Sequence, residues 1–391
     1  MTNGQRDIRT VAAIGGASVN LTNDVALDWA PTWSADGRFV YFASDRGGAM
    51  GIWRLAISEA TGSPKGNPEV IASGADAWFD LPRVAPDGRA MLFRSRIEST
   101  NPAVASLDPQ ALRVSNARLL QHRTGTLLPT DISRDGQWLA LMSPDEPGSD
   151  LWVMRTDGRD LRCITDDPQR DFYSHFTPDG RAVTFFSNRL GHYEGFQIGV
   201  DGSGLTPLTN FNSGVFVTVF APDGKRLALS GIFGGPRVGQ APWPATEARS
   251  TALGPKTLNG RTVNLLSWSP DSRWLAGYLD LPSGDTRGHV EVEVATGVAR
   301  QLNDDSRGYA IEWLPDARHV VYFTAGGVLV RQDVVTLARD TIRGDLSYVP
   351  DDFSTLSLAP DGRALYFGAR EMQATRWMVR RGPPPERASQ P

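Results

Sequence analysis

The stretch Phe176-Thr177-Pro178-Asp179-Gly180-Arg181, with the apolar run Ala182-Val183-Thr184-Phe185-Phe186 after it, decides the fold of this 391-residue chain. Proline presets φ, aspartate bonds its own backbone, and glycine accepts the positive φ that a Cβ opposes. A turn of this composition between two apolar segments predicts a β-hairpin.

The same turn occurs eight times along the chain. Its aspartates stand at Asp36, Asp87, Asp135, Asp179, Asp223, Asp271, Asp316 and Asp361. An apolar residue stands three positions before each aspartate, and another stands four positions after it. A period of roughly 40 to 50 residues with room for four short strands is typical of propeller blades. We therefore predict an all-β fold, an eight-bladed β-propeller of four-stranded antiparallel blades.

The individual units support this interpretation. In the fourth unit we expect strands at 174–177, 182–188, 195–200 and 205–209. The third copy has Arg134 where proline is usual, and the seventh has Ala317 where glycine is usual. Both copies keep their apolar positions, so we expect both to form blades.

The ends of the chain suggest how the ring closes. The last repeat has room for strands at Arg363–Gly368 and Thr375–Arg380 but lacks a fourth strand of its own. Val19–Thr22 resembles the closing strand of the other units. We expect this amino-terminal strand to pair beside Thr375–Arg380 and close one propeller domain of residues 1–380. Residues 381–391 are polar and rich in proline, so a disordered tail is predicted.

Composition narrows the class of partner. The 40 Lys and Arg residues and 44 Asp and Glu residues are scattered, which argues against a nucleic-acid surface. No apolar run is long enough for a transmembrane helix, so no membrane insertion is expected. The chain as given shows no signal peptide, which predicts a cytoplasmic protein, or a periplasmic one if a leader was removed. The lone Cys163 is expected to be buried in a strand, and we expect a monomer without a cofactor.

Motifs that carry chemistry in a single stretch are missing from the sequence. It contains no Gly-x-Ser-x-Gly elbow, phosphate-binding loop, His-Glu-x-x-His or paired Cys-x-x-Cys. Their absence weighs against hydrolase, nucleotide or structural-zinc chemistry, so we lean against an enzyme. A propeller can nevertheless assemble a site from single residues on several blades, so catalysis stays open.

Loops that lead into the first strand of each unit are rich in aromatic and acidic residues. Such residues around a channel mouth suit the binding of a protein or peptide partner. The predicted contact residues are Trp78, Asp80, Phe172, Tyr173, Tyr309 and Phe353. The structural alternative is that these rings only fasten each loop to its neighbouring blade.

The fourth unit concentrates titratable groups. Candidates for a metal or acid–base site are Asp171, His175, His192 and Glu194. The structural alternative is a hydrogen-bonded surface pair. For the eight turn aspartates we prefer a structural role over calcium binding. The irregular stretch Gly231–Arg261 is either a functional flap or tolerated surface variation.

The repeat resembles that of the TolB-type propeller family, whose units run Pro-x-Trp-Ser-Pro-Asp-Gly-Arg/Lys and later Ser-x-Arg-x-Gly. Pro31-Thr32-Trp33-Ser34-Ala35-Asp36-Gly37-Arg38 and Ser44-Asp45-Arg46-Gly47-Gly48 match this form. The resemblance implies the propeller fold but no particular function. TolB itself has six blades behind a small α/β domain, whereas this sequence holds eight repeats. Eight repeats are also similar to the propeller of prolyl-oligopeptidase relatives, whose catalytic domain has no counterpart here.

Our leading hypothesis for function is a non-enzymatic scaffold that binds a protein or peptide, or acts as a sensor, through its channel mouth. The alternative is a propeller enzyme, such as a lyase or hydrolase with a site on the fourth blade. A detached propeller of a prolyl-oligopeptidase-like or amidohydrolase system is a further alternative.

Overall fold

The structure, a computed structural model, describes residues 6–74, 78–144, 148–209, 217–230, 238–242, 251–252, 257–305, 309–344, 346, 349–350 and 356–380. In these ranges the helices and strands of the structure are all β-strands, and no helix is present. This confirms the all-β prediction for the described part of the chain. Accordingly, the described residues contain no helix that is long and apolar enough to span a membrane. The predicted tail 381–391 lies outside the described residues.

The chain divides into two compact units. The smaller unit comprises Met1–Glu98 and Met372–Pro391, and the larger unit comprises Ser99–Glu371. Two long strands, β8 (Ala90–Asp108) and β34 (Ala364–Arg380), begin in one unit and end in the other. β8 comprises the second and third strands of the second repeat as one continuous strand, and β34 does the same for the eighth repeat. The single domain of residues 1–380 stays a prediction.

Repeats three to seven each form an antiparallel sheet in the larger unit. Their strands are β11 (Leu128–Ile132), β12 (Trp138–Ser143), β13 (Asp150–Arg155) and β14 (Arg162–Cys163); β15 (Asp171–Phe176), β16 (Ala182–Ser187), β17 (Glu194–Gly199) and β18 (Thr206–Pro207); β19 (Val217–Phe220), β20 (Arg226–Ser230), β21 (Val238–Pro242) and β22 (Thr251–Ala252); β23 (Thr257–Leu258), β24 (Arg261–Trp268), β25 (Trp274–Asp280), β26 (Thr286–Glu293) and β27 (Ala299–Gln301); and β28 (Ile311–Trp313), β29 (His319–Phe323), β30 (Leu329–Asp333) and β31 (Arg339–Thr341). The third and seventh copies therefore form blades, as predicted. The stretch Gly231–Arg261 is less irregular than expected, because its described residues include β21, β22 and β23.

A further sheet of the larger unit combines two distant repeats. From the eighth repeat come β33 (Leu356–Leu358) and the first part of β34, and from the second repeat come the last part of β8 and β9 (Arg113–Leu119). The Leu107 N–H donates to the Arg363 carbonyl at 2.8 Å, where the two halves meet. The short strands β10 (Gly125–Thr126) and β32 (Val349–Pro350) extend this sheet.

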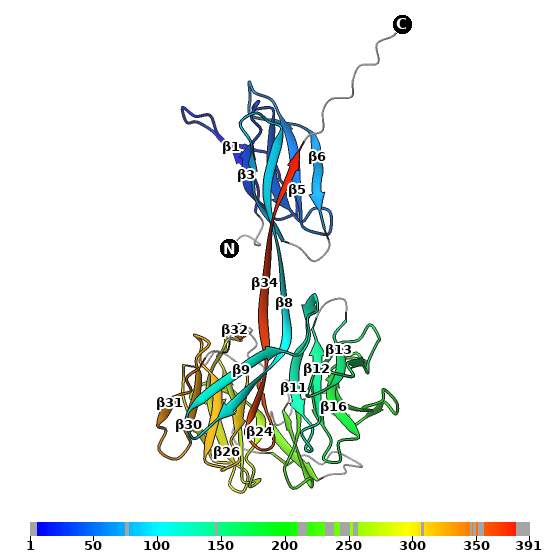
Figure 1. The fold of residues 1–391 in the computed structure, drawn as a ribbon, viewed down its shortest axis with the longest axis vertical. Helices are drawn as coiled ribbons and strands as arrows, with labels where there is room; N and C mark the ends of the chain where they lie inside the picture. The colour runs from blue at the N-terminus through cyan, green and yellow to red at the C-terminus, as the bar shows by residue number, and fades with distance from the viewer. Residues whose placement is uncertain are drawn as a thin grey trace. The chain divides into compact units, whose positions relative to one another are not determined.

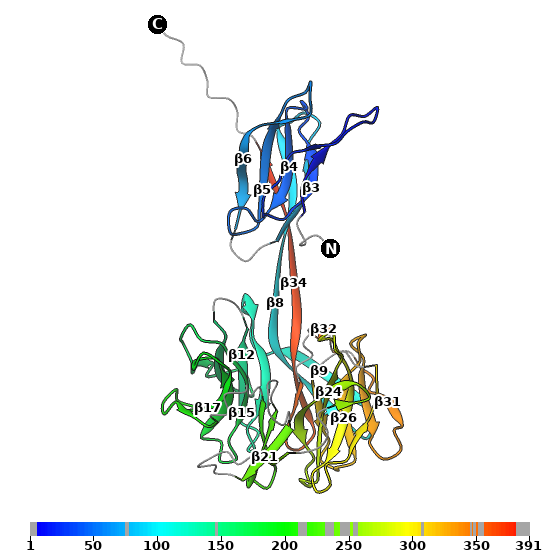
Figure 2. The ribbon, with the colours of Figure 1, turned by 180° about the vertical axis from the view of Figure 1, so that it is seen from behind.

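The first strands of these sheets form a closed ring. β11, β15, β19, β24, β28 and β33 contact one another in that order, and β33 contacts β11 again. Among the described residues, the larger unit is thus a propeller of six blades, whose sheets are drawn side by side in Figures 1 and 2. A single ring of eight blades is not confirmed.

The turn chemistry is the same in every repeat. Each turn aspartate accepts the backbone N–H two residues later, at 2.8 to 3.1 Å. Gly180 has φ of 69°, and even Ser272 and Ala317 adopt φ of 58° and 53° at the same position. These contacts give the aspartates the predicted structural role.

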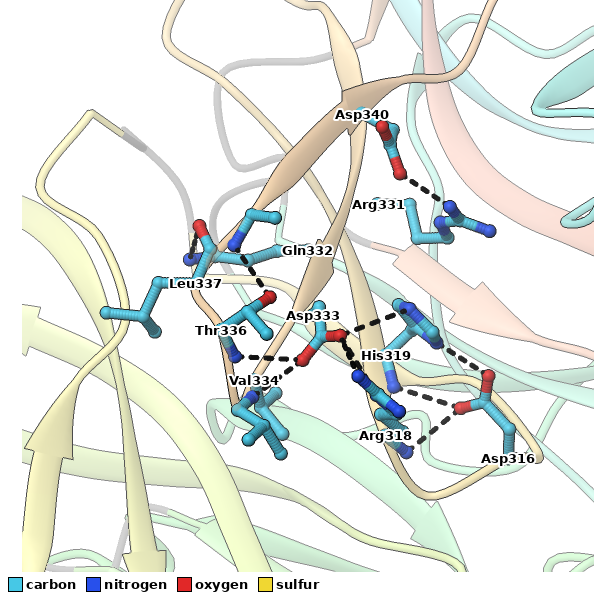
Figure 3. A network of polar contacts seen from close by, with 12 residues as sticks. Asp316, Arg318, His319, Arg331, Gln332, Asp333, Val334, Thr336, Leu337 and Asp340 are labelled. Carbon is cyan, nitrogen blue, oxygen red and sulfur yellow. Dashed lines mark hydrogen bonds and ion pairs between the residues drawn. The ribbon is translucent and has the colours of Figure 1, made fainter.

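Charged groups hold the seventh turn, whose glycine is replaced by Ala317 (Figure 3). Asp316 accepts the backbone N–H of His319 at 2.9 Å and lies 2.7 Å from its Nδ1. Arg318 donates to Asp333 Oδ2, with an Nη2–Oδ2 distance of 2.7 Å. Burial raises the pKa of Asp333, but Arg318 and two backbone N–H groups outweigh it and hold the pKa below its ordinary value.

The smaller unit holds the first repeat and half of the second. Its first sheet consists of β3 (Asp28–Trp33), β4 (Phe39–Ser44), β5 (Gly51–Ile57) and β6 (Pro64–Ser73). This sheet packs against β7 (Trp78–Val84), which pairs with the first part of β8. The last part of β34 belongs to the same group, since Trp377 Nε1 donates to Ser95 Oγ at 2.7 Å.

The amino terminus forms a hairpin with a different partner from the one predicted. β2 (Val19–Asn20) pairs with β1 (Arg9–Thr10), and no pairing with residues 375–380 appears among the described residues. The Leu21 N–H donates to the Ile8 carbonyl at 2.8 Å, and Thr22 Oγ1 accepts the Ile8 N–H.

The hairpin pairs as the last two strands of a blade do. Leu208 donates to Gly195, and Leu302 to His289, at the same sequence separation as Leu21 and Ile8. The segment Val19–Thr22 therefore pairs with the strand just before it in sequence, as the fourth strand of a blade pairs with the third. Residues 6–22 form the outer half of a blade, with Ile8 and Leu21 packed on the core of the first repeat.

Candidate binding channel

The residue four positions before each turn aspartate faces the centre of the six-bladed ring. Its neighbour one position later packs between blades, and side chains alternate along a strand. In the larger unit the inward positions are Asp131, His175, Val219, Ser267, Glu312 and Ser357. A cavity of about 340 Å³ lies here, with lining residues from all six inner strands, among them Asp131, His175 and Glu312.

Turn residues surround the same cavity. Its lining includes the turn prolines Pro178, Pro222, Pro270, Pro315 and Pro360. At the third copy Arg134 replaces the proline, and its Nη2 donates to the carbonyls of Ala221 and Pro222 at 3.0 and 2.6 Å. The cavity therefore lies toward the turn end of the channel, and Arg134 ties two blades together at its rim.

Asp131 and His175 lie side by side in the channel. Asp131 Oδ2 accepts the backbone N–H of Phe176 at 2.7 Å and lies 3.8 Å from His175 Nδ1, beyond hydrogen-bond distance. Burial raises the pKa of Asp131 to about 7 and lowers the pKa of His175 to about 4. His175 Nε2 is buried and has no hydrogen-bond partner in the described part of the chain. The histidine is therefore neutral at pH 7, beside a carboxyl group that titrates there.

Glu312 supplies a second carboxyl group. It accepts a hydrogen bond from Ser267 Oγ at 2.9 Å. Burial, with a smaller contribution from the charge of Asp131, raises the pKa of Glu312 to about 8. Ser357, at the same ring position on β33, is 2% exposed, and its Oγ has no partner among the described groups. The channel thus collects polar groups that the protein satisfies only in part.

Two of the predicted contact residues, Tyr173 and Tyr309, lie near Tyr278. Tyr309 lies edge-on to Tyr278, with ring centroids 4.9 Å apart. Burial, with a smaller effect of the nearby Tyr173, Asp280 and Tyr309, raises the pKa of Tyr278. Tyr173 precedes His175 on β15, so this tyrosine group lies toward the other end of the strand from the turn.

Phe172 is linked to Tyr173 through Phe186, on which the Tyr173 ring also packs at 5.8 Å between ring centroids. Phe172 packs on Phe186 at 5.4 Å between ring centroids. Trp78 and Asp80 belong to the smaller unit, where Trp78 packs on Trp29 at 5.5 Å and Asp80 pairs with Arg94 at 2.6 Å. Phe353 lies outside the described residues.

The four metal or acid–base candidates do not form one group, although His192 and Glu194 lie together. Asp171 is buried and accepts two hydrogen bonds from Arg189, each at 2.9 Å. His192 Nε2 lies 3.4 Å from Glu194 Oε1, while His175 lies beside Asp131 instead. No group of three His, Cys, Asp or Glu side chains in the described ranges is placed to hold a metal ion.

Cys163 differs from its prediction. It lies in the last strand of its blade, as expected, but it is exposed, and its Sγ donates to the Thr165 carbonyl at 2.8 Å. The reason is that last strands lie on the rim of the propeller, where only one side contacts the blade.

Sequence reasoning missed Asp131, Glu312 and Arg134. A signal was present in the residues four positions before each turn aspartate, which read Thr32, Arg83, Asp131, His175, Val219, Ser267, Glu312 and Ser357. This position is mostly polar, although its neighbour one position later is apolar in every copy. Comparing the repeats position by position would have identified the channel lining.

No family model matches the chain. Over 92 residues it is 33% identical to the Tol-Pal system protein TolB of Wolinella succinogenes, covering 24% of this chain and 22% of that protein. Over 158 residues it is 25% identical to the TolB protein of Helicobacter hepaticus, covering 38% and 37%. The chain therefore spans well under half the length of these curated relatives.

Among solved structures, an oligogalacturonate lyase from Vibrio parahaemolyticus matches 93% of this chain and 96% of its own, with 10% identity and a TM-score of 0.43. The repeat motif and these curated relatives support a similarity of the chain to the TolB-type β-propeller family.

Proposed function

We propose that this protein binds a peptide segment of a partner protein in the channel of its larger unit. The observation that carries the proposal is the cavity of about 340 Å³ that all six inner strands line. It combines apolar walls, such as Phe176, Trp268 and Trp313, with a few polar groups at the centre, as ligand sites commonly do. The two curated TolB relatives carry the name of a Tol-Pal system protein, which agrees with a protein partner.

The tyrosines provide a second set of contacts in this proposal. Tyr173 and Tyr309 lie at the starts of inner strands, away from the turns, and we propose them as anchors for the partner, a role in which aromatic rings are effective. Trp78 and Asp80 remain proposed contacts on the smaller unit.

The channel geometry favours binding over catalysis. Asp131 and His175 are 3.8 Å apart, so no hydrogen bond links them as a base is linked to the residue that orients it. A lyase or hydrolase would need a substrate to bring these groups closer. Peptide binding needs no such rearrangement.

Peptide selection tests the proposal. A phage library of random 12-residue peptides is selected against the purified protein, and the enriched peptides are measured against two variants. Val219→Phe narrows the channel, and Val298→Phe makes the same change at a position that is 62% exposed. We expect Val219→Phe to weaken binding more than about tenfold and Val298→Phe to leave it unchanged.

Melting curves verify that both variants are folded. If Val219→Phe is unstable, Arg134→Ala replaces it, because removing the side chain that ties the rim should change peptide affinity. Peptides that bind all variants equally would place the site elsewhere and overturn the proposal.

A further inference from the structure

We propose that the channel receives a primary ammonium group, held between the Asp131 and Glu312 carboxylates. This inference rests on the proposed function, since the ammonium group would be a lysine side chain or the amino terminus of the bound peptide. It specifies which chemistry the channel selects.

Three buried carboxylates elsewhere in the described part of the chain pair with an arginine. Asp28 pairs with Arg46 at 2.7 Å, Asp171 pairs with Arg189 at 2.9 Å, and Glu291 pairs with Arg300. A buried carboxylate without a partner is costly, and an arginine removes that cost at each of these positions.

The two channel carboxyl groups have no such partner in the described part of the chain. Asp131, whose side chain is 28% exposed, accepts the Phe176 N–H and lies 3.8 Å from the neutral His175, and Glu312 accepts a hydrogen bond from the hydroxyl of Ser267. Arg134 acts on Asp131 from the rim and lowers its pKa, but burial has the larger effect. A cation that enters the channel would give both groups the partner that the fold withholds.

Two further buried polar atoms on the inner strands lack partners in the described part of the chain. Ser357 Oγ and His175 Nε2 are buried and make no hydrogen bond within the described residues. Ser357 lies on β33, the inner strand that contacts the Asp131 strand β11, and Glu312 lies on β28, on the other side of β33. His175 lines the cavity together with Asp131 and Glu312, which come from three different blades, whereas Ser357 is buried at the same ring position on β33.

The arrangement suits an ammonium group better than a guanidinium group. An ammonium ion is compact and carries three donors that point in different directions. A guanidinium ion is planar and is matched best by both oxygens of a single carboxylate. Here the carboxyl groups stand on separate blades, each offering one side of the cavity.

The raised pKa values of Asp131 and Glu312 add a pH dependence. Both groups are largely protonated at pH 6 and largely ionised above pH 8. Binding of an ammonium ion should therefore strengthen as pH rises from 6 to 8.5, and it should release protons.

The test uses butylammonium as the probe and 1-butanol as the uncharged control, in isothermal titration of the full chain at pH 8.5. We expect butylammonium to bind and butanol of equal concentration to bind at least tenfold more weakly. Glu312→Gln and Asp131→Asn should each weaken butylammonium binding at least tenfold. Glu293→Gln, outside the channel, is the matched control and should have no effect.

Two further probes distinguish the source of the ammonium group. Nα-acetyl-lysine methylamide presents only a side-chain ammonium, and trialanine amide presents only an amino terminus. Binding of either one in a Glu312-dependent manner supports the inference. Equal binding of butylammonium and butanol, or butylammonium binding that Glu312→Gln leaves unchanged, overturns it.

The two proposals fail in different ways. If no peptide is enriched but butylammonium binds through Glu312, the proposed function fails and the ammonium site stands. If enriched peptides bind in the channel with no loss when their ammonium groups are acetylated, the ammonium site fails and the proposed function stands.

Discussion

Trp33 and Trp268 occupy the same position of the repeat in the two units, yet their surroundings differ. Trp268 in the larger unit is 6% exposed, and its indole N–H donates to the Val219 carbonyl at 3.0 Å. Trp33 in the smaller unit is 51% exposed. The repeat sequence places a tryptophan at this position in both units. The side chain is buried only where the inner strand of a neighbouring blade covers it.

The smaller unit contains a reason for the difference. Its amino-terminal hairpin packs on the first repeat as the outer half of a blade, through Ile8 and Leu21. Among the described residues of the unit, no inner half of that blade pairs with the hairpin. In the larger unit every inner strand contacts the next, so the equivalent tryptophans Trp268 and Trp313 are covered.

The largest expected effect comes from removing that hairpin. Deletion of residues 1–24 takes Ile8 and Leu21 away from Val40 and Phe42 and leaves one sheet face uncovered. We expect a loss of about 4 kcal/mol or more in the smaller unit, because each buried aliphatic side chain contributes about 2 kcal/mol. Hydrogen exchange of peptides from 39–57 measures it, with peptides from 138–155 as the internal reference. Unchanged exchange in 39–57 would show that the hairpin is not part of this core.

A matched pair of substitutions tests the comparison directly. Trp268→Ala should cost about 3 to 5 kcal/mol, since it removes a buried indole and its hydrogen bond. Trp33→Ala should cost less than about 1 kcal/mol, as is usual for a half-exposed side chain. Denaturant titration followed by hydrogen exchange measures both. Equal costs would mean that a neighbouring strand covers Trp33 in solution, which would favour one larger ring.

The carboxyl groups in the channel of the six-bladed ring should make the stability of the larger unit depend on pH. The pKa values of Asp131 and Glu312 are raised to about 7 and 8 from 3.8 and 4.5, so the folded state holds more protons than the unfolded state between about pH 4 and 8. Stability should therefore fall as pH rises through this window. His175, whose pKa is lowered to about 4 from 6.5, acts in the opposite sense and costs stability as pH falls from about 6.5 to 4.

Glu312→Gln separates these contributions. Glutamine cannot ionise. The free energy of unfolding of the variant should therefore fall by on the order of 2 kcal/mol less than that of the wild type between pH 6 and 9. Denaturant titrations across this range, with Glu293→Gln as the control, measure the difference. Parallel curves for wild type and Glu312→Gln would contradict the assigned burial of this carboxyl group.

The smallest effect should be equal in the two units. Gly37 and Gly180 have φ of 71° and 69°, and no atom lies within 4 Å of a Cβ added at either position. Alanine at each should cost about 1 kcal/mol, because only the local backbone conformation opposes it. Equilibrium unfolding measures both variants. A clear difference between them would mean that turn stability depends on the neighbouring blade, as tryptophan burial does.

Sequence reasoning predicted the blades well because each hairpin is specified locally. The Pro-Asp-Gly turn and the apolar positions on either side determine two paired strands without reference to any other repeat. Even the seventh copy folds as expected, since Asp316 and the side chains of Arg318 and His319 compensate for the missing glycine. The candidate site was predicted less well. His175 was singled out for a group with Asp171, while the structure places it beside Asp131, a residue from another blade.

The sequence by itself determined the strand pairs, the turns and the alternation that points one residue per repeat toward the channel. These are short-range properties, set by φ preferences, local hydrogen bonds and the two-residue period of a strand. Only the tertiary structure decided which halves combine into a blade. The inner half of the eighth repeat pairs with the outer half of the second, and Val19–Thr22 pairs within its own hairpin. The repeats are so similar that the strands of one could pair with those of another, so long-range packing decides which strands pair. The same packing brings Asp131, His175 and Glu312 into one cavity.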